Sequence, residues 1–192
     1  MNRRDRKVVI AIGAPKSGKT TVARSLLRDL EAEQGDERAI AVVDPGRQFR
    51  GGFVPAGGDI GGWLEEVMPP SASAPAAVRA ILFDDGDSYL RPSPPNGSAE
   101  RDLYLRHRWW RTDLIVTARR PQNLSPLIWS ACSVLYLFRT NPADRSARER
   151  LDEFAPGVEV PREPFDCVVL DPYTGEQLRC RTKPNGGVEV LR

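Results

Sequence analysis

Short apolar runs alternate with longer stretches of mixed polarity along most of the chain. Each run has the length of a strand and is followed by a polar or glycine-containing segment, so the pattern predicts buried strands separated by helices and loops. The predicted strands lie at residues 7–12, 39–43, 79–83, 113–117 and 134–139. The predicted helices lie at residues 18–34, 60–67, 99–110, 125–131 and 142–154, with Asn141 as the N-cap of the last. Alternation of this kind is typical of an α/β protein with a mostly parallel sheet covered by helices on both faces.

The end of the chain follows a different pattern. Residues 167–170 and 177–181 flank the turn-forming sequence Asp171-Pro172-Tyr173-Thr174-Gly175, which predicts a C-terminal β-hairpin. The chain has 192 residues, of which 40% are hydrophobic, and this is enough for one domain with a sizeable core. We therefore expect a single domain over residues 1–192, with a core at about 7–155 and a β extension at about 160–192.

The segment after the first predicted strand carries the most specific motif. It reads G-x-x-x-x-G-K-[ST], and its residues are Gly13, Ala14, Pro15, Lys16, Ser17, Gly18, Lys19 and Thr20. In such a phosphate loop the glycines let the backbone wrap closely round a polyphosphate, the amides of the loop and of the next helix donate to it, and the lysine adds a positive charge. Thr20 can place its hydroxyl on Mg²⁺, and Thr21 continues the helix that binds the phosphates. The flanking strand and helix favour this interpretation over a simple glycine-rich turn, so we expect ATP and Mg²⁺ as cofactors.

An acidic pair follows the third apolar run. We expect Asp84 at the tip of this strand, beside the strand that leads into the phosphate loop, where it can hold the shell of Mg²⁺. Asp85 can orient and polarise an attacking water. The alternative is that either carboxylate caps the next segment, which also contains Asp87. An acidic pair after a phosphate loop favours ATP hydrolysis over nucleotide binding alone.

Charge, cysteine content and hydropathy limit the partners and the cellular compartment that we expect for this protein. The formal net charge of +2 does not by itself indicate a nucleic-acid partner. The three cysteines are far apart and form no C-x-x-C pair, so neither a disulfide framework nor a zinc site is expected. The sequence contains no recognisable signal peptide and no apolar segment long enough to cross a bilayer. We expect a cytoplasmic protein without membrane insertion, which a membrane-bound partner could still recruit.

Basic residues concentrate in the middle of the chain. They are Arg101, Arg106, Arg108, Arg111, Arg119 and Arg120. Four features follow one another along this part of the chain. They are the acidic pair, the cluster Leu105-Arg106-His107-Arg108, the strand 113–117 with its end Ala118-Arg119-Arg120-Pro121, and the sequence Tyr136-Leu137-Phe138-Arg139. Over roughly residues 7–155, this order resembles the HerA/FtsK superfamily of DNA-pumping ATPases, and most of all the genome-packaging ATPases of tailless, membrane-containing phages. It is also similar to the zonula-occludens-toxin-like proteins of filamentous phages, which usually add a membrane anchor.

The resemblance implies a three-layer P-loop fold of the additional-strand type. It also implies an ATP-hydrolysing motor that translocates double-stranded DNA without reading its sequence, for viral genome packaging into a capsid. The same resemblance implies a homo-oligomeric ring and viral partners in the capsid or at a membrane. It also implies that the protein is found in the host cytoplasm or in the virion. Members usually have a glutamate where this chain has Asp85, and they often have a γ-phosphate-sensing glutamine where it has Arg119. These departures imply a base of shorter reach and a residue that stabilises charge instead of orienting water.

An arginine finger supplied by a neighbouring subunit is also implied, and Arg106 and Arg108 match the corresponding segment best. The complete predicted catalytic set is Lys19, Asp84, Asp85, Arg106, Arg108 and Arg119. For either finger candidate, the alternative is a solvated helix face or an ion pair with Glu100 or Asp102.

The neighbouring aromatic residues and two loops are candidates for DNA contact. Trp109 and Trp110 can stack on bases or pack in the core, and packing is the expected role of at least one of them. The single histidine, His107, is expected to be a hydrogen-bonding helix residue because phosphoryl transfer needs no imidazole. The arginine-containing loops 46–62 and 91–98 can grip DNA phosphates in the pore of a ring.

Two functions of other classes also fit the phosphate loop. One is a kinase acting on a nucleotide or small molecule, with the arginine-rich stretch 139–150 as its lid. The other is a nucleotide-dependent assembly switch that does not hydrolyse ATP, in which Asp85 is a structural acid. Stimulation of ATP turnover by DNA distinguishes the motor from both.

Overall fold

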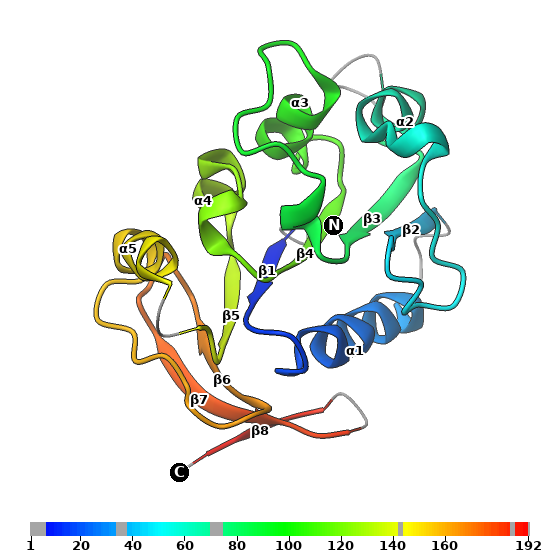
Figure 1. Ribbon diagram of the computed structural model, residues 1–192. Helices are drawn as coiled ribbons and strands as arrows, with labels where there is room; N and C mark the ends of the chain where they lie inside the picture. The colour runs from blue at the N-terminus through cyan, green and yellow to red at the C-terminus, as the bar shows by residue number, and fades with distance from the viewer. Residues whose placement is uncertain (1–6, 34–37, 70–74, 142–143, 185–186, 192) are drawn as a thin grey trace.

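The computed structural model describes residues 7–33, 38–69, 75–141, 144–184 and 187–191. Its strands form one 8-stranded sheet in the order β2-β3-β4-β1-β5-β6-β7-β8 (Figure 1). They are β1 (Val8–Ile12), β2 (Ala39–Val43), β3 (Val78–Phe83), β4 (Asp113–Ala118), β5 (Val134–Phe138), β6 (Asp166–Leu170), β7 (Gln177–Thr182) and β8 (Val188–Val190). Strands β2, β3, β4, β1 and β5 run parallel, and β6, β7 and β8 continue the sheet antiparallel.

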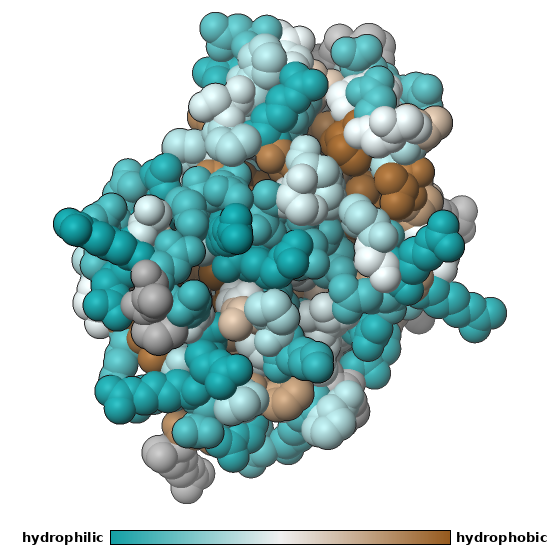
Figure 2. Space-filling view, in the orientation of Figure 1, coloured by the Kyte–Doolittle hydropathy of each residue, from teal (hydrophilic) through white to brown (hydrophobic). Residues whose placement is uncertain are grey.

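Helices cover both faces of the sheet. They are α1 (Lys19–Ala32), α2 (Ile60–Val67), α3 (Ala99–Arg106), α4 (Pro126–Ala131) and α5 (Arg145–Phe154), with short 3₁₀ helices at Ala56–Gly58, Gly86–Ser88 and Pro121–Asn123. Because side chains alternate along β1, Val9 packs with buried residues of α1, whereas Ile10 packs with those of α2 to α5. The face of the molecule in Figure 2 is mainly hydrophilic, with apolar residues exposed near α2. The predicted three-layer fold is confirmed, with its mostly parallel sheet and its C-terminal hairpin of β6 and β7.

The strand that carries the acidic pair does not lie where the sequence analysis placed it. Strand β4, not β3, pairs with β1, and β3 pairs with β4 and β2. The expectation that Asp84 ends a strand beside β1 is therefore wrong. Neighbours in sequence are often neighbours in a sheet, but that tendency does not fix the order of strands. The insertion of β4 places Thr117, whose register partner on β1 is Ala11, between the phosphate loop and the acidic pair.

Two local predictions also differ from the structure, and one strand was not predicted. Helix α3 ends at Arg106, short of the predicted end, and the following residues form a turn into β4 in which Arg111 has a left-handed backbone (φ 54°). The N-cap of α5 is Asp144, whose side chain accepts a hydrogen bond from the Ala147 N–H, and not Asn141. Strand β8 was not predicted because its short, exposed sequence has no distinct pattern. Residue 34 and residue 142, at the predicted helix ends, lie outside the described residues.

The parallel strands give the sheet two functionally different edges. The carboxyl edge, where β1, β3 and β4 end, carries the phosphate loop, the acidic pair and residues 117–120. The amino edge, where these strands begin, carries the turn from α3 into β4. There the Ala76 N–H donates to the Trp110 carbonyl oxygen, and the Thr112 hydroxyl donates to the Val78 carbonyl oxygen. Ligands of open parallel sheets bind at the carboxyl edge.

Candidate functional site

The phosphate loop is fixed at its base by the two strands that flank β1. The Gly13 N–H donates to the Ala118 carbonyl oxygen at the end of β4 (3.1 Å), and the Ala14 N–H donates to the Arg139 carbonyl oxygen after β5 (2.7 Å). A Cβ on Gly13 would lie 2.6 Å from the Phe138 Cβ, so only glycine allows this close approach. Gly18 has φ 118°, a conformation that other residues rarely adopt. The loop is therefore held in one shape by packing and not by its own sequence alone.

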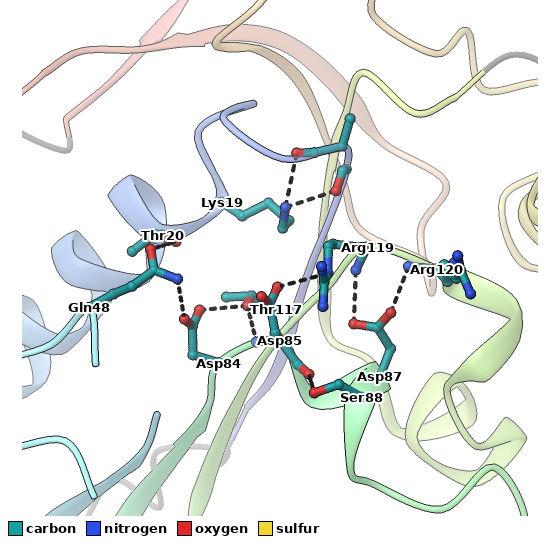
Figure 3. A network of polar contacts seen from close by, with 12 residues as sticks. Lys19, Thr20, Gln48, Asp84, Asp85, Asp87, Ser88, Thr117, Arg119 and Arg120 are labelled. Carbon is teal, nitrogen blue, oxygen red and sulfur yellow. Dashed lines mark hydrogen bonds and ion pairs between the residues drawn. The ribbon is translucent and has the colours of Figure 1, made fainter. Parts of the chain in front are cut away.

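Lys19 is buried inside this loop. Its Nζ donates to the carbonyl oxygens of Gly13 (2.8 Å) and Ala14 (3.0 Å), as Figure 3 shows. Burial lowers the pKa of Lys19, and the nearby charges of Asp85 and Asp84 oppose that shift. The Ser17 Oγ is buried without a hydrogen-bond partner in the described part of the chain. A buried donor of this kind and a desolvated ammonium group both suit an anionic ligand such as a phosphate.

Asp84 and Asp85 are joined through one hydroxyl of β4. The Thr117 Oγ1 donates to Asp84 Oδ1 (2.7 Å) and accepts from the Asp85 N–H (2.8 Å) (Figure 3). Burial raises the pKa of the Asp84 carboxyl, with smaller contributions from the negative charges of Asp85 and Asp44, while the hydrogen bond from Thr117 opposes the rise. Sequence analysis did not select Thr117, because a threonine inside an apolar strand carries no motif.

The Asp85 carboxylate is not used as a cap. Asp85 is the N-cap of the 3₁₀ helix Gly86–Ser88 without a side-chain capping bond, and its backbone is left-handed (φ 50°). Its Oδ1 lies 3.6 Å from the Arg119 Nε, and both side chains are partly exposed. The neighbouring carboxylate of Asp87 instead binds the chain after β4, where it accepts from the backbone N–H groups of Arg119 and Arg120. Asp85 is thus positioned toward solvent and Arg119, as a group that acts on a ligand must be.

Gln48 is a second residue that sequence analysis missed. Its Nε2 donates to Asp84 Oδ2 (3.1 Å), and its Oε1 accepts from the Thr20 hydroxyl (3.4 Å) (Figure 3). Arg24 of α1 donates to the Gln48 carbonyl oxygen (2.6 Å), which fixes this loop against the helix. Sequence analysis could not identify Gln48, because the loop between β2 and α2 has neither hydrophobic periodicity nor a known motif.

The oxygen atoms around Gln48 fit a magnesium ion. A threonine hydroxyl and one carboxylate are the protein ligands that Mg²⁺ uses beside nucleotide phosphates and water. Thr20 and Asp84 both hydrogen-bond to the side-chain amide of Gln48, Thr20 at its oxygen and Asp84 at its nitrogen. Among the described residues, no group of three or more His, Cys, Asp or Glu side chains could hold a metal by itself. Thr20 and Asp84 would therefore hold Mg²⁺ together with a bound nucleotide.

The structure separates the predicted arginines. Arg119 lies at the carboxyl edge beside Asp85, whereas Arg106 and Arg108 lie at the amino edge, away from the phosphate loop of their own chain. The Arg106 Nε lies 3.7 Å from Asp102, which is one of the alternatives considered for it. Arg108 is exposed and donates to the hydroxyl of Tyr173.

The other residues of the same turn divide between core and surface. Trp110 is buried in the core and Trp109 is 66% exposed, so one tryptophan has the predicted packing role. The His107 Nδ1 lies 3.2 Å from the Tyr104 carbonyl oxygen. Burial lowers the pKa of His107, which keeps the imidazole neutral near pH 7. His107 is the C-cap of α3, one residue beyond the helix in which it was predicted.

Solved structures with the same fold include viral packaging enzymes. The genome packaging NTPase B204 from Sulfolobus turreted icosahedral virus 2, in complex with AMPPCP, has a TM-score of 0.68 and 13% identity, covering 93% of this chain and 97% of that chain. The DNA-packaging ATPase B204 from Sulfolobus Turreted Icosahedral Virus has a TM-score of 0.58 and 12% identity, covering 92% and 98%. The N-terminal domain of zonular occludens toxin from Neisseria meningitidis has a TM-score of 0.55 and 13% identity, covering 98% and 95%. No protein-family model and no curated protein sequence matches the chain.

These structures confirm the resemblance drawn from the sequence at the level of fold. The chain shares the P-loop NTPase fold of the viral packaging enzymes and of the zonular occludens toxin domain. The β4 insertion between β1 and β3 is the additional strand that the resemblance implies.

Proposed function

We propose that this chain is an ATP-hydrolysing motor that translocates double-stranded DNA and packages a viral genome into a capsid. The observation that carries the proposal is the arrangement of Lys19, Asp84, Thr117 and Asp85 at one sheet edge, where the phosphate loop meets the ends of β3 and β4. Binding of ATP is supported by the fold shared with a packaging NTPase whose structures hold AMPPCP and ATP-γS.

Each residue has a role that its environment supports. Lys19 leaves its two carbonyl partners to bind the terminal phosphates, which restore the favourable environment for its charge. Thr20 and Asp84 would hold Mg²⁺, which would neutralise charge on the phosphates. Asp85 accepts a proton from the attacking water, and Thr117 fixes its backbone. Arg119 stabilises the negative charge that develops on the transferred phosphoryl group.

A ring of identical subunits is the second part of the proposal. Arg106 and Arg108 lie at the opposite edge from the phosphate loop, so they can reach a nucleotide only in a neighbouring copy. A cavity of about 790 Å³ opens beside Ala14, between Arg139 and residues 158–162, on the β5 side of the phosphate loop.

DNA contact in this proposal is made by pore-facing loops. Arg47 and Arg50, in the exposed segment after β2, and Arg91, after the helix at Gly86–Ser88, can contact phosphates without reading bases. None of the described helices is long and apolar enough to cross a membrane. Capsid or membrane-associated viral proteins are the proposed docking partners, in the host cytoplasm or on the virion.

The test is ATP turnover by the purified protein with and without double-stranded DNA. Turnover that DNA stimulates supports the motor. Turnover that requires a small phosphate acceptor identifies a kinase, and binding without turnover identifies a nucleotide-dependent switch. The mass of the protein in solution with a non-hydrolysable ATP analogue tests the ring. A mass of several subunits is expected, because the arginine finger must come from a neighbouring subunit.

A further inference from the structure

An aromatic side chain lies exposed against the phosphate loop. Phe165, the residue before β6, is 45% exposed. Its backbone N–H donates to the Ser17 carbonyl oxygen (3.0 Å). A Cβ built on Gly18 would lie 3.4 Å from the Phe165 Cδ1, so the ring lies beside the outer surface of the loop. Burial in the core does not explain a large apolar side chain at this position.

The backbone of Phe165 is strained and firmly held. Its φ of 67° is left-handed, which is rare for a bulky residue. Both the backbone N–H and the hydroxyl of Thr182 donate to the Phe165 carbonyl oxygen, at 2.8 and 3.0 Å. The next residue, Asp166, forms a two-point ion pair with Arg181 of β7. A strained residue fixed from both sides, with its ring left in solvent, is a reason to look for a ligand.

The C-terminal strands pack tightly enough to hold this position. A Cβ on Gly18 would lie 2.8 Å from the Thr182 Oγ1 and 2.8 Å from the Phe138 Cε1. Thr182 itself is buried. Figure 1 shows β7 and β8 extending past the start of α1. The antiparallel end of the sheet therefore forms one wall of the site, with Phe165 at its rim.

The sheet order indicates which way a bound nucleotide runs. Asp84 and Asp85 follow β3 and mark the side on which the terminal phosphate of the proposed nucleotide would lie. Strand β1 stands between β4 and β5, and β6 follows β5. A triphosphate with its terminal phosphate toward β3 crosses the end of β1 and carries its nucleoside toward β5 and β6. Because β6 is antiparallel, with Cys167 opposite Phe138, its beginning lies at this same carboxyl edge.

We propose that Phe165 is the stacking platform for the nucleobase of bound ATP. This assignment rests on the proposed binding of a nucleoside triphosphate by the phosphate loop. An aromatic ring offers a flat apolar face to a base, and a ring already fixed by its backbone loses little freedom on binding. Phenylalanine has no hydrogen-bonding atom in its side chain, so this contact favours purines by area and does not separate ATP from GTP.

The test compares ligands with and without a base. Calorimetry measures the dissociation constants of ATP, GTP and inorganic tripolyphosphate for the wild-type chain and for Phe165→Leu, which keeps an apolar side chain but loses the ring. We expect ATP and GTP to bind about tenfold to a hundredfold more weakly to the variant, with tripolyphosphate affinity unchanged. Phe165→Trp should retain ATP affinity, and its added fluorescence should be quenched by ATP but not by tripolyphosphate. Tyr173→Leu, at an aromatic residue that is 63% exposed at the amino edge, is the matched control.

The outcomes separate this proposal from the proposed function. If Phe165→Leu weakened the binding of ATP and of tripolyphosphate equally, Phe165 would only support the phosphate loop. That result would overturn its assignment as the stacking platform. Unchanged ATP affinity would also overturn it, since the base would then lie elsewhere. If the wild-type chain binds neither ATP nor tripolyphosphate, the proposed nucleotide binding itself fails.

Discussion

The two edges of the parallel strands differ in the side chains that they present and in how firmly these are held. At the carboxyl edge, Asp84 and Thr117 are buried and hydrogen-bonded, and Arg119 lies against Asp85. At the amino edge, Arg108 and Trp109 are exposed. Chemistry that needs fixed geometry belongs where neighbouring strands constrain each group, and exposed arginines and aromatics suit contact with another molecule. The comparison predicts that changes at the first edge act within a subunit and those at the second act between subunits.

The largest effect is expected from removal of the charged groups at the carboxyl edge. Lys19→Ala should abolish both nucleotide binding and turnover, because the positive charge inside the loop is lost. Asp85→Ala should abolish turnover but keep tight ATP binding, because its carboxylate is the proposed base for the attacking water. Calorimetry and phosphate release measure the two effects. Normal hydrolysis by Asp85→Ala would show that another group is the base.

The amino edge gives the next largest effect if its arginines serve a neighbouring subunit. Arg106→Ala and Arg108→Ala are each tested, and the variant that removes the finger should lower turnover about 10³-fold or more. Mixing it with Lys19→Ala should restore part of the turnover, because the Lys19→Ala subunit supplies the missing arginine to an intact site.

A similar mixture of Lys19→Ala with Arg119→Ala should restore nothing, since Arg119 lies in the same site as Asp85. Equal behaviour of the two mixtures would contradict the division between the edges. Full activity of both Arg106→Ala and Arg108→Ala would leave them as the solvated or ion-paired residues that their surroundings also permit.

Two buried threonines on opposite edges sharpen the comparison at the level of one hydroxyl. Thr117 and Thr112 are both fully buried, and the Thr112 hydroxyl donates to the Val78 carbonyl oxygen (3.1 Å). Replacement of either by valine should lower the free energy of unfolding by about 1–3 kcal/mol, because a buried acceptor loses its donor. Only Thr117→Val should also slow turnover, about tenfold to a hundredfold, since Asp84 and Asp85 both lose a partner. Denaturant melts and ATPase assays measure these effects, and equal loss of turnover in both variants would contradict the role of Thr117.

The sequence predicted those parts of the site that local motifs encode. Lys19 and Thr20 follow from the phosphate loop, and Asp84 and Asp85 follow from an apolar run with an acidic end. These features depend on short stretches of chain with a strand before them. Their catalytic roles remain predictions, as does the division of the chain into one core and one β extension.

The rest depended on contacts between distant segments. Gln48 meets Asp84 from a loop without any motif, and Phe165 reaches Ser17 only because β6 runs antiparallel to β5. Thr117 is recognised as a site residue only from the strand order, which puts β4 between β1 and β3. Strand order and loop placement are set by packing across the whole sheet, which hydrophobic periodicity does not report.

The smallest expected effect concerns Asp84 and pH. Burial raises the pKa of its carboxyl, so the fold without ligand favours the protonated form, and this contribution to stability is lost as pH rises through the raised pKa. At neutral pH, Asp84→Asn should therefore stabilise the ligand-free protein slightly, by up to about 1 kcal/mol, while it weakens the binding of Mg²⁺ with ATP. Acidification should reduce the stabilisation of the wild-type protein by Mg²⁺ and ATP, because the protonated carboxyl cannot hold the metal. Thermal melts from neutral to acidic pH measure both effects, and an Asp84→Asn variant with the same pH-dependent stabilisation as wild type would exclude Asp84 as the group that titrates.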